Sequence, residues 1–188
     1  HFNYERRTGE EQAMKNLDIP QGSNCGDSSM VVIYLETMIK SGGFKPDVLL
    51  LNCGLHDIKT DVQTGAKQIP LEDFKANIAK IVSLCASQPF ELVWMRITPC
   101  FAKIHNAENS HFHRFEKDCA AYNTVADQIM ADAGVKSIDL HNYTLKLGEI
   151  DSLFCDHVHF TEDVREKQAA YLAGWLEAWR VMNSQSEF

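Results

Sequence analysis

The 188-residue chain is 45% hydrophobic and 23% charged, with a formal net charge of −8 at pH 7. This length suits one domain with a core of its own, so we treat residues 1–188 as a single domain. No run approaches the roughly 18 consecutive apolar residues that cross a membrane. The acidic balance also argues against general nucleic-acid binding, which depends on basic contacts to phosphate. We therefore expect no membrane span and no nucleic-acid partner.

Six cysteines are spread along the chain, and no two of them have C-x-x-C spacing: Cys25, Cys53, Cys85, Cys100, Cys119 and Cys155. Most lie beside apolar runs, which favours small buried thiols over a disulfide framework or a zinc ribbon. Thiols of this kind point to a reducing compartment, so we expect a cytoplasmic protein. A disulfide set stays open as an alternative, because spacing alone does not give connectivity.

Short apolar runs alternate with amphipathic segments along the chain. Runs that are apolar throughout are typical of a parallel sheet covered on both faces, and their alternation with helices predicts βαβ crossovers. In chain order we expect a weak strand at 17–19, a helix at 28–40, a strand at 47–53, a helix at 71–87, a strand at 91–98, a helix at 115–133, a strand at 135–140 and a helix at 161–182. The expected fold class is α/β, with three layers in the order α/β/α.

Three polar segments lie where strands end or helices begin, at residues 22–29, 52–57 and 156–161. Ligands of open α/β sheets bind beyond the carboxyl ends of the strands, so these segments are where we expect the chemistry. In the last segment, Asp156 and His159 have the spacing D-x-x-H. This spacing lets a carboxylate accept the Nδ1 proton of an imidazole, as the base of a hydrolase requires. The same pair could also be an exposed Asp and His near a helix start.

The other two segments offer hydrogen-bond donors for an oxyanion. Gly26 precedes a helix and leaves its backbone N–H uncovered, although Asp27 or Ser28 could simply cap that helix. His56 follows Gly54 at a strand end and can donate a ring N–H, although it could equally be a structural histidine. We expect neighbouring Asp57 to cap or brace this loop.

Together the segments resemble the SGNH (GDSL-type) hydrolase superfamily. Residues 24–26 resemble its second block, residues 45–57 its third block and strand, and residues 156–160 its last block, and the Ile-Thr-Pro at 97–99 also fits. The resemblance covers nearly the whole chain. It implies a flavodoxin-like parallel sheet, no cofactor, and a serine-type ester hydrolase acting on small acyl esters such as acetylated carbohydrate. It implies that Asp156 and His159 complete a triad.

The resemblance also assigns the oxyanion hole to Gly26 and His56. The third block of the family normally reads G-x-N-D, and here His56 stands where the Asn amide is expected. An imidazole N–H has a similar reach, so we expect it to replace the amide as a donor.

The nucleophile is the part of the family pattern that we do not find. Gly26-Asp27-Ser28 spells the first block, but no apolar strand leads into it. The interval from Gly26 to Gly54 also has room for only one helix and one strand. We therefore do not assign Ser28 as nucleophile, and we expect the first strand and the serine upstream of His1. A chain without that interior strand would leave sheet edges unpaired, so we expect it to be poorly stable and inactive alone.

Two other functions stay open. A metal-dependent hydrolase could use the histidine-rich loops, with ligands from His105, His111, His113, Asp156, His157 and His159. A non-catalytic member of the fold could bind an ester or a glycan in the same cleft. Arg114 could contact a substrate carboxylate or brace its loop. The partner we expect is a small-molecule ester.

Overall fold

The computed structural model describes residues 26–108 and 111–184. Its main sheet is parallel, with the strand order β1-β3-β5. In register, Val48 lies opposite Glu91 and Met95 lies opposite Ile138. The strands are β1 (Val48–Leu51), β3 (Glu91–Met95) and β5 (Lys136–Ile138). The parallel sheet expected from the continuous apolar runs is therefore confirmed, and β3 crosses its centre.

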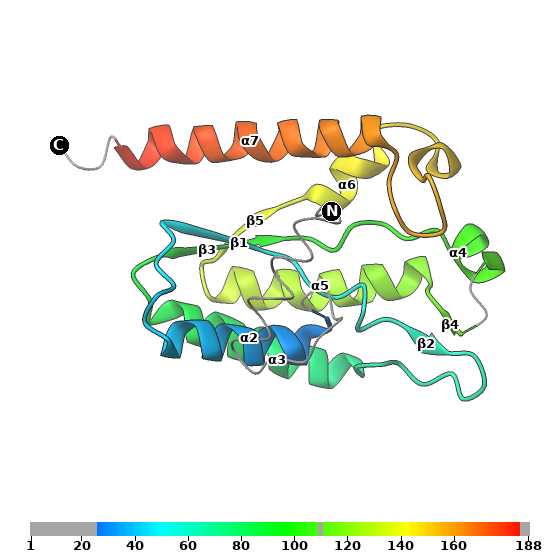
Figure 1. Cartoon of the computed structure of the whole chain (residues 1–188), viewed down its shortest axis with the longest axis horizontal. Coiled ribbons are helices and arrows are strands. Elements are labelled where there is room, and N and C mark those ends of the chain that lie inside the picture. Colours follow the sequence, from blue (N-terminus) through cyan, green and yellow to red (C-terminus); the bar gives the residue numbers. More distant parts are fainter. Residues whose placement is uncertain (1–25, 109–110, 185–188) are drawn as a thin grey trace.

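Helices cover both faces of this sheet (Figure 1). Three of them pack together on one face, and the C-terminal helix lies on the other. The first group is α2 (Ser28–Lys40), α3 (Leu71–Ala86) and α5 (Glu116–Asp132); the second face carries α7 (Glu162–Ser184) with the short α6 (Leu140–Leu145). The expected α/β/α layering is confirmed. The weak strand expected at 17–19 lies outside the described residues.

The core lies between β3 and the helix layer formed by α2, α3 and α5. Helix α3 buries Phe74, Ile78 and Ile81, a spacing that repeats on one helical face. They pack with fully buried Trp94 of β3. The Phe74 ring lies 4.8 Å from the ring of Tyr122 on α5, measured between centroids. Burial of this apolar face fixes α3 and α5 beneath the strands and so places the loops at the strand ends.

Helix α7 packs less deeply on the opposite face. Its anchors are polar and aromatic: Trp179 Nε1 donates to Glu91 Oε2 at 2.6 Å, and the rings of Tyr143 and Tyr171 stack with centroids 4.0 Å apart. No helix among the residues described is long and apolar enough to span a bilayer.

The structure corrects the sequence expectations at three places. The strand expected at 135–140 ends at Ile138, because the Asp139 side chain accepts from Asn142 N and starts α6. Short elements absent from the expectations occur after β1 and β3. They are β2 (Thr60–Asp61), α4 (Ala102–Glu108), β4 (Phe112–His113) and, later, the 3-10 helix η1 (Ile150–Leu153). Cys155 is exposed, whereas Cys53, Cys85, Cys100 and Cys119 are buried as expected.

Candidate active site

Directly before the cap of α2 lies a glycine that no other residue could replace without strain. Gly26 has φ +63°, and a Cβ atom there would lie 2.2 Å from Met30 Sδ. Asp27 then caps the helix, accepting from the backbone N–H of Ser29 at 3.1 Å and of Met30 at 3.2 Å. Gln68 Nε2 donates to its other oxygen at 2.7 Å. The cap therefore leaves the Gly26 N–H beside a helix N-terminus, where a negative charge is favoured.

Ser28 is a buried structural residue in this arrangement. Its backbone N–H donates to both carboxylate oxygens of Asp57 at 3.0 Å, and its hydroxyl donates to Asp57 Oδ1. Asn77 Nδ2 donates to the Ser28 hydroxyl oxygen at 2.9 Å. The side chain is fully buried and its hydroxyl has two partners, neither of which is a histidine. This environment argues against Ser28 as a nucleophile, although its three-residue motif spells one.

Asp57 braces the loop after β1, one of the two roles expected for it. Burial raises the pKa of Asp57 to about 6, and the hydrogen bonds from Ser28 only partly oppose that rise. Through its hydrogen bonds with Ser28, the Asp57 side chain ties the N-terminus of α2 to the residues that follow β1. Gly26 and His56 are held near each other by these bonds.

His56 lies half-buried in that loop, directly before Asp57. Burial, followed by the positive charges of Lys59 and Arg114, lowers the pKa of His56 to about 4. The ring is therefore neutral near pH 7, with one N–H to donate. Gly54, two residues before His56, has φ +133°, and a Cβ atom there would lie 2.2 Å from Ile97 Cδ1. This turn of the loop therefore requires glycine. The neutral imidazole has the chemistry expected of an oxyanion donor.

Asp156 and His159 form the hydrogen bond that the D-x-x-H spacing permits. His159 Nδ1 lies 2.6 Å from Asp156 Oδ2, and the backbone N–H groups of Val158 and His159 donate to Asp156 Oδ1 at 2.7 and 2.6 Å. Partial burial alone would raise the pKa of Asp156, but these hydrogen bonds outweigh it and lower the pKa to about 2. Asp156 is thus ionised at neutral pH and orients the imidazole through Nδ1.

A tight chain reversal holds this pair in place. Phe154 and Phe160 form an antiparallel bridge, and the Cys155 N–H donates to the His159 carbonyl at 2.8 Å. The reversal leads directly into α7 at Glu162. Its backbone bonds fix the two side chains on one short loop.

Helix α4 and β4 link this loop to the loop of His56. On α4, His105 Nδ1 lies 2.9 Å from His157 Nδ1 and 3.2 Å from the His157 carbonyl oxygen. After β4, Arg114 Nε donates to the Leu55 carbonyl at 2.7 Å. Figure 1 shows α4, β2, β4 and the loop before α7 gathered at one end of the molecule. The loop of Asp156 and His159 therefore contacts α4, and Arg114 contacts the loop of His56, which Asp57 in turn ties to the start of α2 after Gly26. Arg114 braces this loop, one of its two expected roles.

A family model for GDSL-like lipases and acylhydrolases matches residues 11–172. The chain belongs to this GDSL-like lipase/acylhydrolase family. It is accordingly a carboxylic ester hydrolase. The SGNH (GDSL-type) resemblance described above is confirmed. A comparison with curated protein sequences gives no significant match.

Solved structures show the same fold as this GDSL-like acylhydrolase. A lipase/acylhydrolase from Enterococcus faecalis has a TM-score of 0.62 at 16% identity, over 81% of this chain and 71% of that one. A GDSL-like lipase from Bacteroides thetaiotaomicron has 0.60 at 14%, over 81% and 71%. The acetyl xylan esterase AlAXEase has 0.58 at 16%, over 90% and 88%. At these identities the likeness concerns the fold.

The histidines suggested as metal ligands are not grouped as a metal site in the described part of this GDSL-like acylhydrolase. Among residues 26–108 and 111–184, no group of three or more His, Cys, Asp or Glu side chains is placed to hold a metal ion. His105 and His157 contact each other instead, with ring centroids 4.9 Å apart. That contact joins residues 52 positions apart, so no local spacing pattern could have predicted it.

Proposed function

We propose that this protein is a serine-type hydrolase of small acyl esters in which His159 is the general base and Asp156 orients it. The observation that carries the proposal is the 2.6 Å contact between His159 Nδ1 and Asp156 Oδ2. Nδ1 is committed to the carboxylate, so Nε2 is the nitrogen that can take a proton from a serine. An ionised Asp156 also stabilises the imidazolium that results.

The nucleophile in this proposal is a serine outside the described residues. His159 takes the proton of its hydroxyl as the oxygen attacks the ester carbonyl, and a tetrahedral oxyanion forms. The backbone N–H of Gly26 and the ring N–H of neutral His56 donate to this oxyanion. His159 then protonates the departing alcohol, and a water molecule repeats the sequence on the acyl-enzyme to release the acid. No cofactor takes part in these steps.

For the substrate, we propose acetyl or similarly small acyl groups, with acetylated carbohydrate as the first class to test. The support is the sequence resemblance together with a fold shared with AlAXEase, an acetyl xylan esterase. An acyl-length series of 4-nitrophenyl esters checks the acyl part. We expect acetate to be cleaved with a higher kcat/KM than octanoate, and the reverse order would contradict the small-acyl assignment.

Substitutions in the full-length protein test the two roles. His159→Ala and Asp156→Asn should each lower kcat by roughly 10³–10⁴-fold, with a small change in KM, because the base is removed or misoriented. The matched control is Asp151→Asn, which makes the same chemical change at an exposed position five residues earlier and should leave kcat unchanged. Near-normal turnover by His159→Ala would contradict the proposal.

Metal removal separates this mechanism from a metal-dependent one. Incubation of the full-length enzyme with a chelator, followed by removal of the chelator, should leave kcat unchanged because a serine mechanism uses no metal. Loss of activity that is restored by added zinc would favour the metal-dependent hydrolase instead.

A further inference from the structure

Two cations lie close to one aromatic ring beside the proposed oxyanion hole. Lys59 Nζ lies 4.9 Å from the centroid of the Phe112 ring, and Arg114 Cζ lies 5.0 Å from it. Lys59 lies three residues after His56, and the backbone N–H of Lys59 donates to the His56 carbonyl at 3.2 Å. Both positive charges act on the His56 ring, since both lower its pKa. The two cations therefore lie next to the place where we expect the ester carbonyl.

Neither cation forms an ion pair with a residue in the described part of the chain. Arg114 is only 4% exposed, and its hydrogen-bond acceptor is the neutral carbonyl of Leu55. Other half-buried cations of this acidic chain do have carboxylate partners, such as Lys67 with Asp118. Burying a cation without a counter-charge is costly, so the pair suits a ligand that supplies a negative charge.

The nearest carboxylates are occupied by other bonds. Asp27 is close enough to raise the pKa of Lys59, although burial lowers that pKa more. Its oxygens, however, accept from the start of α2 and from Gln68. Asp61 accepts from the backbone N–H of Gln63 at 3.0 Å and of Thr64 at 2.7 Å. These carboxylates temper the positive potential without neutralising it, which favours a monoanion over a dianion.

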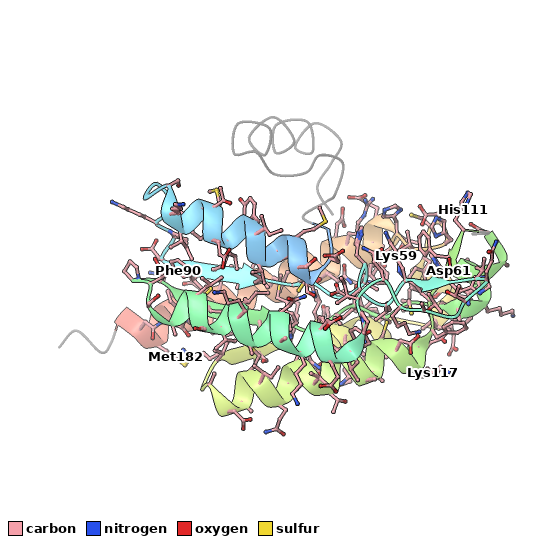
Figure 2. All side chains as sticks on the ribbon, turned by 90° about the horizontal axis from the view of Figure 1, so that it is seen from below. Lys59, Asp61, Phe90, His111, Lys117 and Met182 are labelled. Carbon is pink, nitrogen blue, oxygen red and sulfur yellow. The ribbon has the colours of Figure 1, made fainter. Side chains whose placement is uncertain are left out.

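A hollow of about 280 Å³ lies at this position, lined in part by Lys59, Asp61, Lys67, Gln68 and Phe112. Figure 2 shows Lys59, Asp61 and His111 at one end of the molecule, with Phe90 and Met182 at the other. Gln68 connects the hollow to the α2 terminus through its 2.7 Å bond to Asp27. The volume is near the lower limit for small-molecule sites, so it suits a group about the size of one sugar ring.

We propose that Lys59 binds a carboxylate on the alcohol part of the ester and that the nearby charge of Arg114 adds to the attraction, so that the substrates are acylated hydroxy acids or acidic sugars. The carboxylate belongs to the alcohol part because an acetyl group carries no carboxylate of its own. This inference rests on the proposed esterase function. Arg114 braces Leu55 through Nε and contributes its positive charge beside the hollow without lining it.

Charge preference in catalysis tests the proposal. The probes are 4-acetoxybenzoate and its neutral analogue 4-acetoxybenzamide, with each kcat/KM divided by the rate of alkaline hydrolysis of the same ester. The full-length enzyme should prefer the anion about tenfold, and Lys59→Gln should reduce that ratio about tenfold, whereas Lys59→Arg keeps it. The preference should also fall as sodium chloride rises from about 0.02 to about 0.5 M. Equal normalised rates for the two esters would overturn the proposal.

Lys117→Gln is the matched control, because it removes one positive charge from an exposed residue outside the hollow. It should leave the ratio at the wild-type value. An equal fall in Lys117→Gln and Lys59→Gln would show that the preference reflects net charge alone, and would also overturn the proposal.

A binding measurement, which requires no turnover, tests this inference separately from the esterase function. Calorimetry should show 4-hydroxybenzoate binding about tenfold more tightly than 4-hydroxybenzamide, with the difference lost in Lys59→Gln. If neither ester is hydrolysed but this preference is present, the esterase function fails and the anion site stands. If both esters are hydrolysed and binding shows no preference, the anion site fails and the esterase function stands.

Discussion

At the scale of residues, the hydrogen bonds between Ser28 and Asp57 give the serine of the Gly-Asp-Ser sequence a structural role. A buried carboxylate accepts from the backbone N–H and from the hydroxyl of Ser28, so the serine serves as a tie between α2 and the loop after β1. A serine held in this way has no histidine to take its proton. The motif is therefore structural here, and the catalytic serine must come from elsewhere in the proposed mechanism.

The stability contributed by Asp57 should depend on pH with a defined sign. Its pKa is about 6 in the folded protein, above the value near 4 of an unfolded chain, so the folded state binds the proton first as pH falls. Stability from this group is fully present below pH ~4 and is lost as pH rises to ~6. The free energy of unfolding of the wild type, relative to Asp57→Asn, should therefore fall by up to ~3 kcal/mol over that range.

Urea unfolding at several pH values between 4 and 7 measures this difference. Asp132→Asn, at an exposed position on α5, is the control, and its difference from the wild type should not change in the same way. A difference for Asp57→Asn that is constant across the range would show that the buried carboxylate is already ionised at pH 4.

At the scale of elements, α4 supports the loop that carries the catalytic pair. His105 is fully buried on this helix, and its Nδ1 contacts both the ring and the carbonyl of His157, which lies between Asp156 and His159. Burial, followed by the charge of Arg114, lowers the pKa of His105 to about 4. A neutral ring with its proton on Nδ1 can donate to the His157 carbonyl. His105 is thus a positioning residue for the proposed base.

Two substitutions at His105 separate this role from simple packing. Asn places an amide N–H near the position of Nδ1 and should keep most of the activity, whereas Leu removes the donor. We expect His105→Leu to lower kcat by roughly tenfold or more with little change in KM, because the loop loses its hydrogen bond near the base. Steady-state kinetics and thermal unfolding of both variants give the comparison. Equal losses in the two variants would assign His105 to packing alone.

Elements with a local sequence signal could be predicted, whereas elements that depend on tertiary pairing or on a side-chain cap could not. The Asp156–His159 contact spans three residues, so the spacing permits it, and the family resemblance is what favours it over an unrelated pair. Strand β3 is apolar from Leu92 to Met95, and this run predicts it. The two-residue strands β2 and β4 are too short to produce a periodic pattern, and they pair only because the chain brings Thr60 opposite His113. Asp139 caps α6 with its side chain, which shortens the strand expected there.

Across the whole molecule, the parallel direction of the strands explains why segments distant in the sequence lie at one edge of the sheet. Strands β1, β3 and β5 run parallel, so the loops that follow them leave from the same side. The charge of −8 does not indicate that Lys59 and Arg114 have no acidic partner among residues 26–108 and 111–184. Such a placement depends on tertiary contacts, for example Arg114 with Leu55. The fold class follows from local patterns, whereas the composition of the site requires the structure.

The central claim is that the Asp156–His159 pair, Gly26 and His56 serve a serine outside the described residues. Reaction of the full-length protein with a fluorophosphonate, followed by peptide mass spectrometry, tests it most directly. The account predicts one modified serine that is not Ser28, no modification in His159→Ala, and loss of esterase activity in step with labelling. Modification of Ser28, or labelling that is unchanged in His159→Ala, would contradict it.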